Sequence, residues 1–132
     1  MTREEYELYK QKYRLELEAE QKQIRDKIFD LEKQIQECYE RYEELYLLAQ
    51  ANNKLLVDLE NKKRNASADE KKQYAYNQKL LMEKQTEIYE ERKKYAVLSK
   101  QKVEEKRTLI EKHKDLEIKK GAEPYIEEPE QN

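Results

Sequence analysis

Residues that interrupt helices are almost absent from this chain. Its 132 residues include one glycine, two prolines, one phenylalanine and no tryptophan. Charged residues make up 44% of the chain and hydrophobic residues 36%, and eleven of the hydrophobic residues are tyrosines. This composition is typical of long exposed helices and argues against a globular domain with a large core. Disorder is the competing interpretation of so low a mean hydropathy, but a sustained heptad pattern argues against it.

Several functional classes lack the residues that they need. The net charge is −2 and the two signs are interleaved, whereas a nucleic-acid-binding protein needs a clustered basic face. No apolar run is long enough to span a membrane. The N-terminal residues have no basic start followed by an apolar core, so we expect no secretory signal and a cytoplasmic location. Cys38 is the only cysteine, which excludes an internal disulfide.

Residues that carry out chemistry are equally scarce. A glycine-rich phosphate loop needs several glycines, and the only one is Gly121. Cys38 and His113 are expected far apart, and no His/Cys cluster suits zinc. Carboxylates on exposed helix faces with ordinary acidity do no acid–base work. We therefore expect a protein that is not an enzyme and that has no cofactor and no metal.

An apolar heptad pattern extends from residue 24 to residue 59. Its positions are Ile24, Ile28, Leu31, Ile35, Cys38, Tyr42, Leu45, Ala49, Asn52, Leu56 and Leu59. This spacing places one narrow stripe along a helix, which is the seam of a coiled coil and is stable only when another helix covers it. Before it, Tyr6, Tyr9, Tyr13 and Leu17 form a stripe that joins the heptad through a stutter. Lys10, Arg14 and Gln21 occupy positions where a strict heptad wants apolar residues.

Helix boundaries are indicated by a polar break and by the glycine. Ser67 and Glu70 form a capping box, so we expect a first helix over about 3–62, a tip over 63–67 and a second helix over about 68–119. These elements make one helical hairpin domain, residues 1–120. Gly121 and two prolines then predict a flexible acidic tail over 121–132. The tail is either inert or carries a short recognition motif around Tyr125 and Ile126.

The second helix shows a weaker pattern than the first. Its apolar groups recur every seven residues as neighbouring pairs, such as Leu81-Met82 and Ile88-Tyr89. A polar line falls between the members of these pairs, at Gln78, Gln85, Arg92, Ser99, Lys106 and His113. Polar groups in such a seam lower stability but specify register and partner.

A single short break between two long helices predicts an all-α fold, an antiparallel two-helix coiled-coil hairpin. Folding about Asn65 places Asn52 opposite Gln78 and Ile35 opposite Tyr95. A hairpin of two helices buries one stripe on each, so we expect self-association or a partner protein to complete it.

Apolar residues on the first helix extend beyond the seam near the break. The candidate partner-binding residues are Tyr39, Tyr42, Tyr46, Leu47, Leu48, Leu55 and Val57. They form either a thicker core at the hairpin end or a patch for a partner or a second copy, with tyrosines as anchors.

Two functions follow from this layout. The first is a non-catalytic coiled-coil scaffold or adaptor that binds partner helices. The second function is suggested by a resemblance. In its length, its two-helix layout and the charged segment Lys102–Arg107, the chain resembles the flagellar-export FliJ and type III secretion YscO families. That resemblance implies a small stalk or chaperone-like component of an export machine that contacts its ATPase. Thr2–Tyr6 here replaces the Phe- and Leu-bearing start of the flagellar proteins. The WXG-type secreted proteins and their accessory partners share the layout, but this chain lacks their tryptophan.

Overall fold

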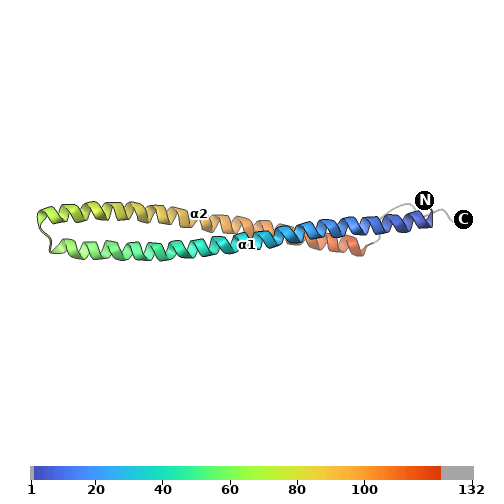
Figure 1. Cartoon of the computed structure of the whole chain (residues 1–132), viewed down its shortest axis with the longest axis horizontal. Helices are drawn as coiled ribbons and strands as arrows, with labels where there is room; N and C mark the ends of the chain where they lie inside the picture. The colour runs from blue at the N-terminus through green and yellow to red at the C-terminus, as the bar shows by residue number, and fades with distance from the viewer. Residues whose placement is uncertain (1, 123–132) are drawn as a thin grey trace. The chain divides into compact units, whose positions relative to one another are not determined.

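The structure, a computed structural model, describes residues 2–122 and consists of two long helices. Helix α1 spans Arg3–Arg64 and helix α2 spans Ala68–Gly121. A turn at residues 65–67 joins them (Figure 1). The described residues contain no strand. The predicted all-α helical hairpin is therefore confirmed.

Side-chain caps begin both helices. The Thr2 hydroxyl accepts a hydrogen bond from the Glu5 amide at 3.2 Å, and the Ser67 hydroxyl accepts one from the Glu70 amide at 3.3 Å. Each cap satisfies an amide that has no partner within its helix. Helix α2 thus begins at the residue that the capping box indicates, whereas α1 continues to Arg64 rather than to about residue 62.

Helix α2 ends at Gly121, slightly beyond the predicted end near residue 119. The Ala122 amide donates to the carbonyls of Ile118 and Lys119, both at 3.2 Å, and Gly121 does not adopt a positive φ. The predicted acidic tail, with its candidate motif around Tyr125 and Ile126, lies outside the described residues from position 123 on.

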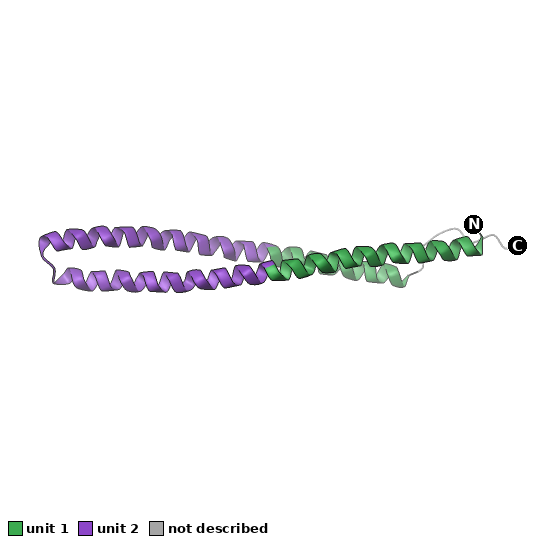
Figure 2. Ribbon diagram, in the orientation of Figure 1, with its two compact units in different colours: residues 1–33, 102–132 green, residues 34–101 purple. Residues whose placement is uncertain are grey.

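The chain divides into two compact units, each containing a segment of both helices (Figure 2). The first unit comprises residues 1–33 and 102–132, and the second comprises residues 34–101. Within the first unit the buried apolar residues are Leu17, Ile24, Leu31 and Leu116. Within the second unit they are Ile35, Cys38, Leu45 and Ile88. Each unit therefore has its own small core between antiparallel helix segments.

The seam predicted on α1 is the face that packs against α2. Six of its eleven positions are buried, namely Ile24, Leu31, Ile35, Cys38, Leu45 and Asn52. The other five are half-buried, namely Ile28, Tyr42, Ala49, Leu56 and Leu59. Because none is exposed, the heptad interpretation of residues 24–59 is confirmed.

The structure corrects the expected pattern before residue 24. Gln21 is not an interruption of the seam but part of it, since only 1% of its surface is exposed. Tyr13 and Leu17 also face α2, whereas Tyr9 is exposed. The seam therefore advances by two successive steps of four, from Tyr13 to Leu17 and from Leu17 to Gln21, which is the spacing of a stutter.

Helix α2 contributes two rows of residues to the interface with α1, and one of these rows is polar. The residues of the predicted polar line all lie in or beside the interface, with Ser99 buried and the other five half-buried. They alternate with residues seven apart that include Leu81, Ile88, Leu109 and Leu116. Helix α2 thus meets the apolar stripe of α1 with one mainly apolar line and one polar line.

The pairing of the two helices differs from the predicted register. Asn52 contacts Gln85 rather than Gln78, which lies one heptad nearer the turn. Two geometric effects explain the shift. The turn is centred on Ala66 instead of Asn65. Side chains also lean toward the N-terminus of their own helix, which is away from the turn on α1 and toward it on α2. Each α1 side chain therefore meets α2 residues that are farther from the turn.

Candidate functional site

A hydrogen-bonded bridge of two amide side chains crosses the interface in the second unit. Asn52 Nδ2 donates to Gln85 Oε1 at 2.8 Å and to the Leu81 carbonyl at 2.9 Å. In return, Gln85 Nε2 donates to the Ala49 carbonyl at 3.2 Å. Buried amides with partners of this kind cost little, whereas unpaired ones are expensive. The bridge therefore favours this register over its neighbours.

Arg92 packs on two of the predicted partner-binding tyrosines. Its guanidinium carbon lies 4.2 Å from the centre of the Tyr42 ring and 4.7 Å from that of Tyr46. This is the geometry of a cation–π contact. Arg92 Nε is buried and has no hydrogen-bond partner in the described part of the chain. Tyr42 is half-buried by this contact, so it belongs to the packing between the helices rather than to the free surface.

The other six predicted partner-binding residues, Tyr39, Tyr46, Leu47, Leu48, Leu55 and Val57, are all exposed. The structure does not bring them together on one face. Tyr39 and Tyr46, seven residues apart, lie on one flank of the seam, while Leu48 and Leu55 lie on the other flank, which also carries the Arg41–Glu91 ion pair of 3.1 Å. Apolar groups thus border the seam on both sides.

Helix α2 adds exposed apolar residues that the sequence interpretation did not select. They are Tyr76, Leu80, Met82, Tyr89 and Val97. Met82 and Tyr89, also seven apart, are 61% and 67% exposed. For Met82 and Tyr89, the sequence does contain a signal, because each is the second member of an apolar pair, Leu81-Met82 or Ile88-Tyr89. Helix α2 is rotated so that the first member of each pair faces α1 and the second faces solvent.

A groove runs along the flank of the second unit that carries Met82. We call it the Met82 groove and define it by two adjoining hollows that share Leu56 and Met82. The larger has a volume of about 530 Å³, and its remaining lining residues are Ala49, Gln85, Thr86, Ile88, Tyr89 and Arg92. The smaller has a volume of about 320 Å³ and is completed by Val57, Glu60 and Gln78. The floor of the groove is apolar, with Arg92 near one end and Glu60 near the other.

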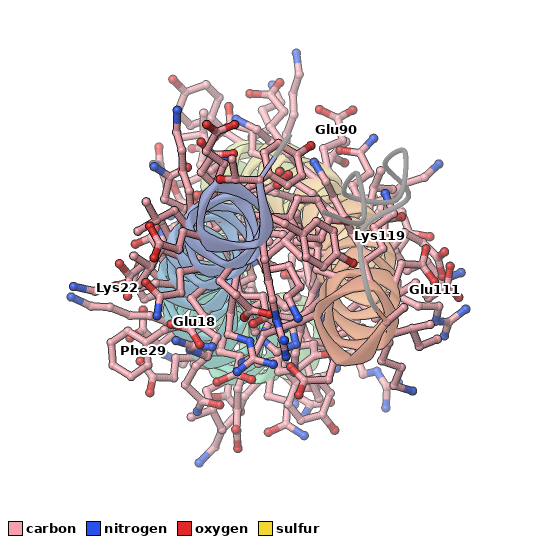
Figure 3. All side chains as sticks on the ribbon, turned by 90° about the vertical axis from the view of Figure 1, so that its right-hand side faces the viewer. Glu18, Lys22, Phe29, Glu90, Glu111 and Lys119 are labelled. Atoms are coloured by element: carbon pink, nitrogen blue, oxygen red, sulfur yellow. The ribbon has the colours of Figure 1, made fainter. Side chains whose placement is uncertain are left out.

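The first unit has fewer exposed apolar residues than the second. They are Leu8, Tyr9, Leu15, Phe29 and Ile118. Phe29 projects outward from the helix pair among charged side chains such as Lys22 (Figure 3). A single exposed apolar residue such as Phe29 is ordinary on a protein surface, whereas Leu8 and Leu15 lie seven residues apart on α1.

The interface of the first unit contains a polar cluster around Gln21. Gln21 Nε2 donates to Glu117 Oε2 at 2.6 Å, and Lys120 Nζ donates to Gln21 Oε1 at 3.5 Å. The hydrogen bond from Gln21 and then the positive charge of Lys120 hold the pKa of Glu117 below its ordinary value of 4.5. His113 Nε2 lies 3.3 Å from Arg25 Nη1 beside this cluster. Across the two helices, Gln21 and Arg25 of α1 thus contact Glu117, Lys120 and His113 of α2.

Among residues 2–122, no group of three or more His, Cys, Asp or Glu side chains is placed to hold a metal ion. Over the same residues, neither helix contains a stretch that is apolar and long enough to cross a membrane. No family model, no curated protein and no solved structure matches the chain, so its resemblance to the FliJ and YscO families depends on the helical layout alone.

Proposed function

We propose that this chain is a non-catalytic helical scaffold that binds the helices of another polypeptide through the second unit. The observation that carries the proposal is the excess of exposed apolar residues there. Eleven of the sixteen exposed large apolar residues in the described part of the chain belong to residues 34–101. That unit buries only four apolar residues of its own. Exposed apolar groups in this number, many of them on the two flanks of the seam, support an interaction site.

The positions of these residues favour a helix as the bound element. Several of them flank the seam, as Tyr46 and Leu55 do on α1 and as Met82 and Tyr89 do on α2, where a third or fourth helix of a bundle packs. Leu47, Tyr76 and Val97 instead lie on the outer faces of the helices. Met82 and the exposed tyrosines suit such contacts, because a methionine adapts to irregular surfaces and a tyrosine contributes a large rigid ring. Isolated coiled-coil pairs carry charged residues at these flanking positions instead.

Site-specific photo-crosslinking in the native cells tests this function. A photoreactive amino acid replaces Leu55 or Met82, and matched replacements of Glu83 and Phe29 serve as controls. Glu83 is exposed on the outer face of α2, and Phe29 is exposed in the first unit. We expect covalent adducts with a helical protein, or with a second copy, at Leu55 and Met82 only. Equal adducts at all four positions, or none at any, would contradict the proposal.

A further inference from the structure

We infer that the Met82 groove binds a second copy of this chain, and that the two second units pack groove to groove in antiparallel orientation about a two-fold axis near Met82. This inference depends on the proposed function, because it names the polypeptide whose helices are bound. A two-fold interface uses the same surface on both copies, so that surface must be complementary to itself.

The groove meets this requirement through the charges at its ends. Arg92 lines it on the side away from the turn, and Glu60 lines it on the side near the turn. Leu56 and Met82 lie between them and line both hollows. An antiparallel copy therefore places its Glu60 against Arg92 of the first copy, and the reverse contact forms at the other end. A parallel copy places like charges together at both ends.

Both charged groups are available for such contacts. Within residues 2–122, neither Arg92 nor Glu60 forms an ion pair. Arg92 has only the tyrosine rings beneath it, and a guanidinium stacked in this way retains nitrogens that can bind a carboxylate. Glu60 accepts one hydrogen bond, from Gln78 Nε2 to Oε2 at 2.7 Å, which leaves its other oxygen unoccupied. Opposite charges at the margins of an apolar interface specify its orientation.

The apolar residues between the two charges supply the contact area. A two-fold axis at Met82 brings the two copies of this side chain together and lays Tyr89 of one copy over the Val57 side of the other. Tyr89 and Met82 are the two most exposed apolar residues of the second unit, and Val57 is 51% exposed. The partner helices would thus cover residues that a single chain leaves in water.

Charge exchange tests the antiparallel two-fold arrangement. We expect the full chain to be a dimer by light scattering. Arg92→Glu and Glu60→Arg each place like charges together twice, so each is expected to weaken dimerisation by about tenfold or more. The double variant, and an equal mixture of the two single variants, restore opposite charges and are expected to recover wild-type dimerisation. A matched control is Glu90→Arg, at an exposed position of α2 that does not line the groove, which leaves dimerisation unchanged.

Cysteine crosslinking provides a second measurement that does not alter either charge. In a Cys38→Ser background, Met82→Cys is expected to form a disulfide-linked dimer under mild oxidation, whereas Glu83→Cys is not. Circular dichroism verifies that each variant keeps its helices. A monomer by light scattering, or a double variant as weak as the single ones, would overturn the inference. A monomer that still forms photo-adducts with another protein at Met82 would leave the scaffold function standing while removing the second copy as its partner.

Discussion

At the scale of single residues, the interface is characterised by polar side chains that have partners on the facing helix. Lys106 forms an ion pair with Glu32 at 3.1 Å, and Gln78 donates to Glu60 at 2.7 Å. Ser99, the one buried member of the polar line, instead donates to the Ala96 carbonyl of its own helix at 2.9 Å. Polar groups of this kind contribute less to stability than apolar ones would, but they distinguish one register from another.

Replacing the buried Asn52 with alanine should destabilise the hairpin by about 1–3 kcal/mol, because the substitution leaves the half-buried Gln85 without its donor. Urea denaturation followed by circular dichroism measures the change. The matched variant N52L/Q85L removes both partners, and we expect it to be as stable as the wild type or more so. A loss of stability in the double variant equal to that in N52A would argue against the bridge as the cause.

Acid should weaken the first unit through Glu117. Its pKa is held below the ordinary value of 4.5, first by the hydrogen bond from Gln21 and then by Lys120. A carboxylate with a lowered folded-state pKa stabilises the fold fully above its unfolded pKa, and this contribution is lost as the pH falls through the folded value. The melting temperature of the wild type should therefore fall toward that of E117Q below pH 4.5. A difference between the two that stays constant with pH would show that the charge of Glu117 plays no part.

At the scale of elements, α1 contributes more of the apolar seam than α2. Six of the eight buried apolar residues of the described chain are on α1, and Leu45, with 1% exposed, is the most deeply buried. The outer faces of α1 are not correspondingly polar, since residues such as Leu47 and Leu55 are more than half exposed. The helix therefore has one face committed to α2 and others that remain open to a further contact.

Truncating Leu45 and Leu47 separates these two environments. We expect L45A to lose about 2–5 kcal/mol of unfolding free energy, the usual result of emptying a packed site. L47A, at a position that is 58% exposed, should change the unfolding free energy of the monomer by no more than about 0.5 kcal/mol. Denaturation at a concentration too low for association measures both. Equal losses of unfolding free energy in the two variants would contradict the assignment of Leu45 to the buried seam and of Leu47 to the exposed surface.

The elements were predictable from the sequence to different degrees. The stripe from Ile24 to Leu59 was predictable because apolar periodicity is a property of one helix. Gln21 was not, because its burial depends on Glu117, which lies on the other helix. Similarly, Met82 and Tyr89 are exposed because α1 presents only a narrow stripe there, which Leu81 and Ile88 are sufficient to cover, whereas both members of the pair Leu109-Ile110 are half-buried. The pattern of α2 alone does not reveal which members of the pairs face α1.

At the scale of the whole molecule, the turn determines which residues of the two helices meet. It consists of only three residues, 65–67. A slip of one helix along the other by a heptad would preserve the spacing of apolar residues, but the turn is too short to accommodate it. The register expected from sequence was wrong at Asn52 because it depends on the centre of this turn and on the opposite lean of the side chains on the two helices. The exposed partner-binding candidates of α1 could be selected without knowledge of the turn, because α1 has more apolar residues than one seam can bury. They are Tyr39, Tyr46, Leu47, Leu48, Leu55 and Val57.

Shortening the helices tests this dependence on the turn. Deleting residues 53–59 from α1 alone should shift every pairing beyond the deletion and reduce the cooperativity and midpoint of thermal unfolding strongly. Deleting 53–59 together with 75–81, which are seven residues of each helix near the turn, should keep the remaining pairs in step and recover cooperative unfolding. Differential scanning calorimetry measures the unfolding of both deletion variants. A single deletion as well tolerated as the paired one would contradict this role of the turn.

The three-residue turn also constrains how such a chain can vary through evolution. A residue gained or lost in one helix displaces the partners of all residues farther from the turn, so changes in length are tolerated only as matched events on both helices. Related sequences should therefore differ in length by whole heptads that are inserted or removed in mirrored positions on either side of residues 65–67.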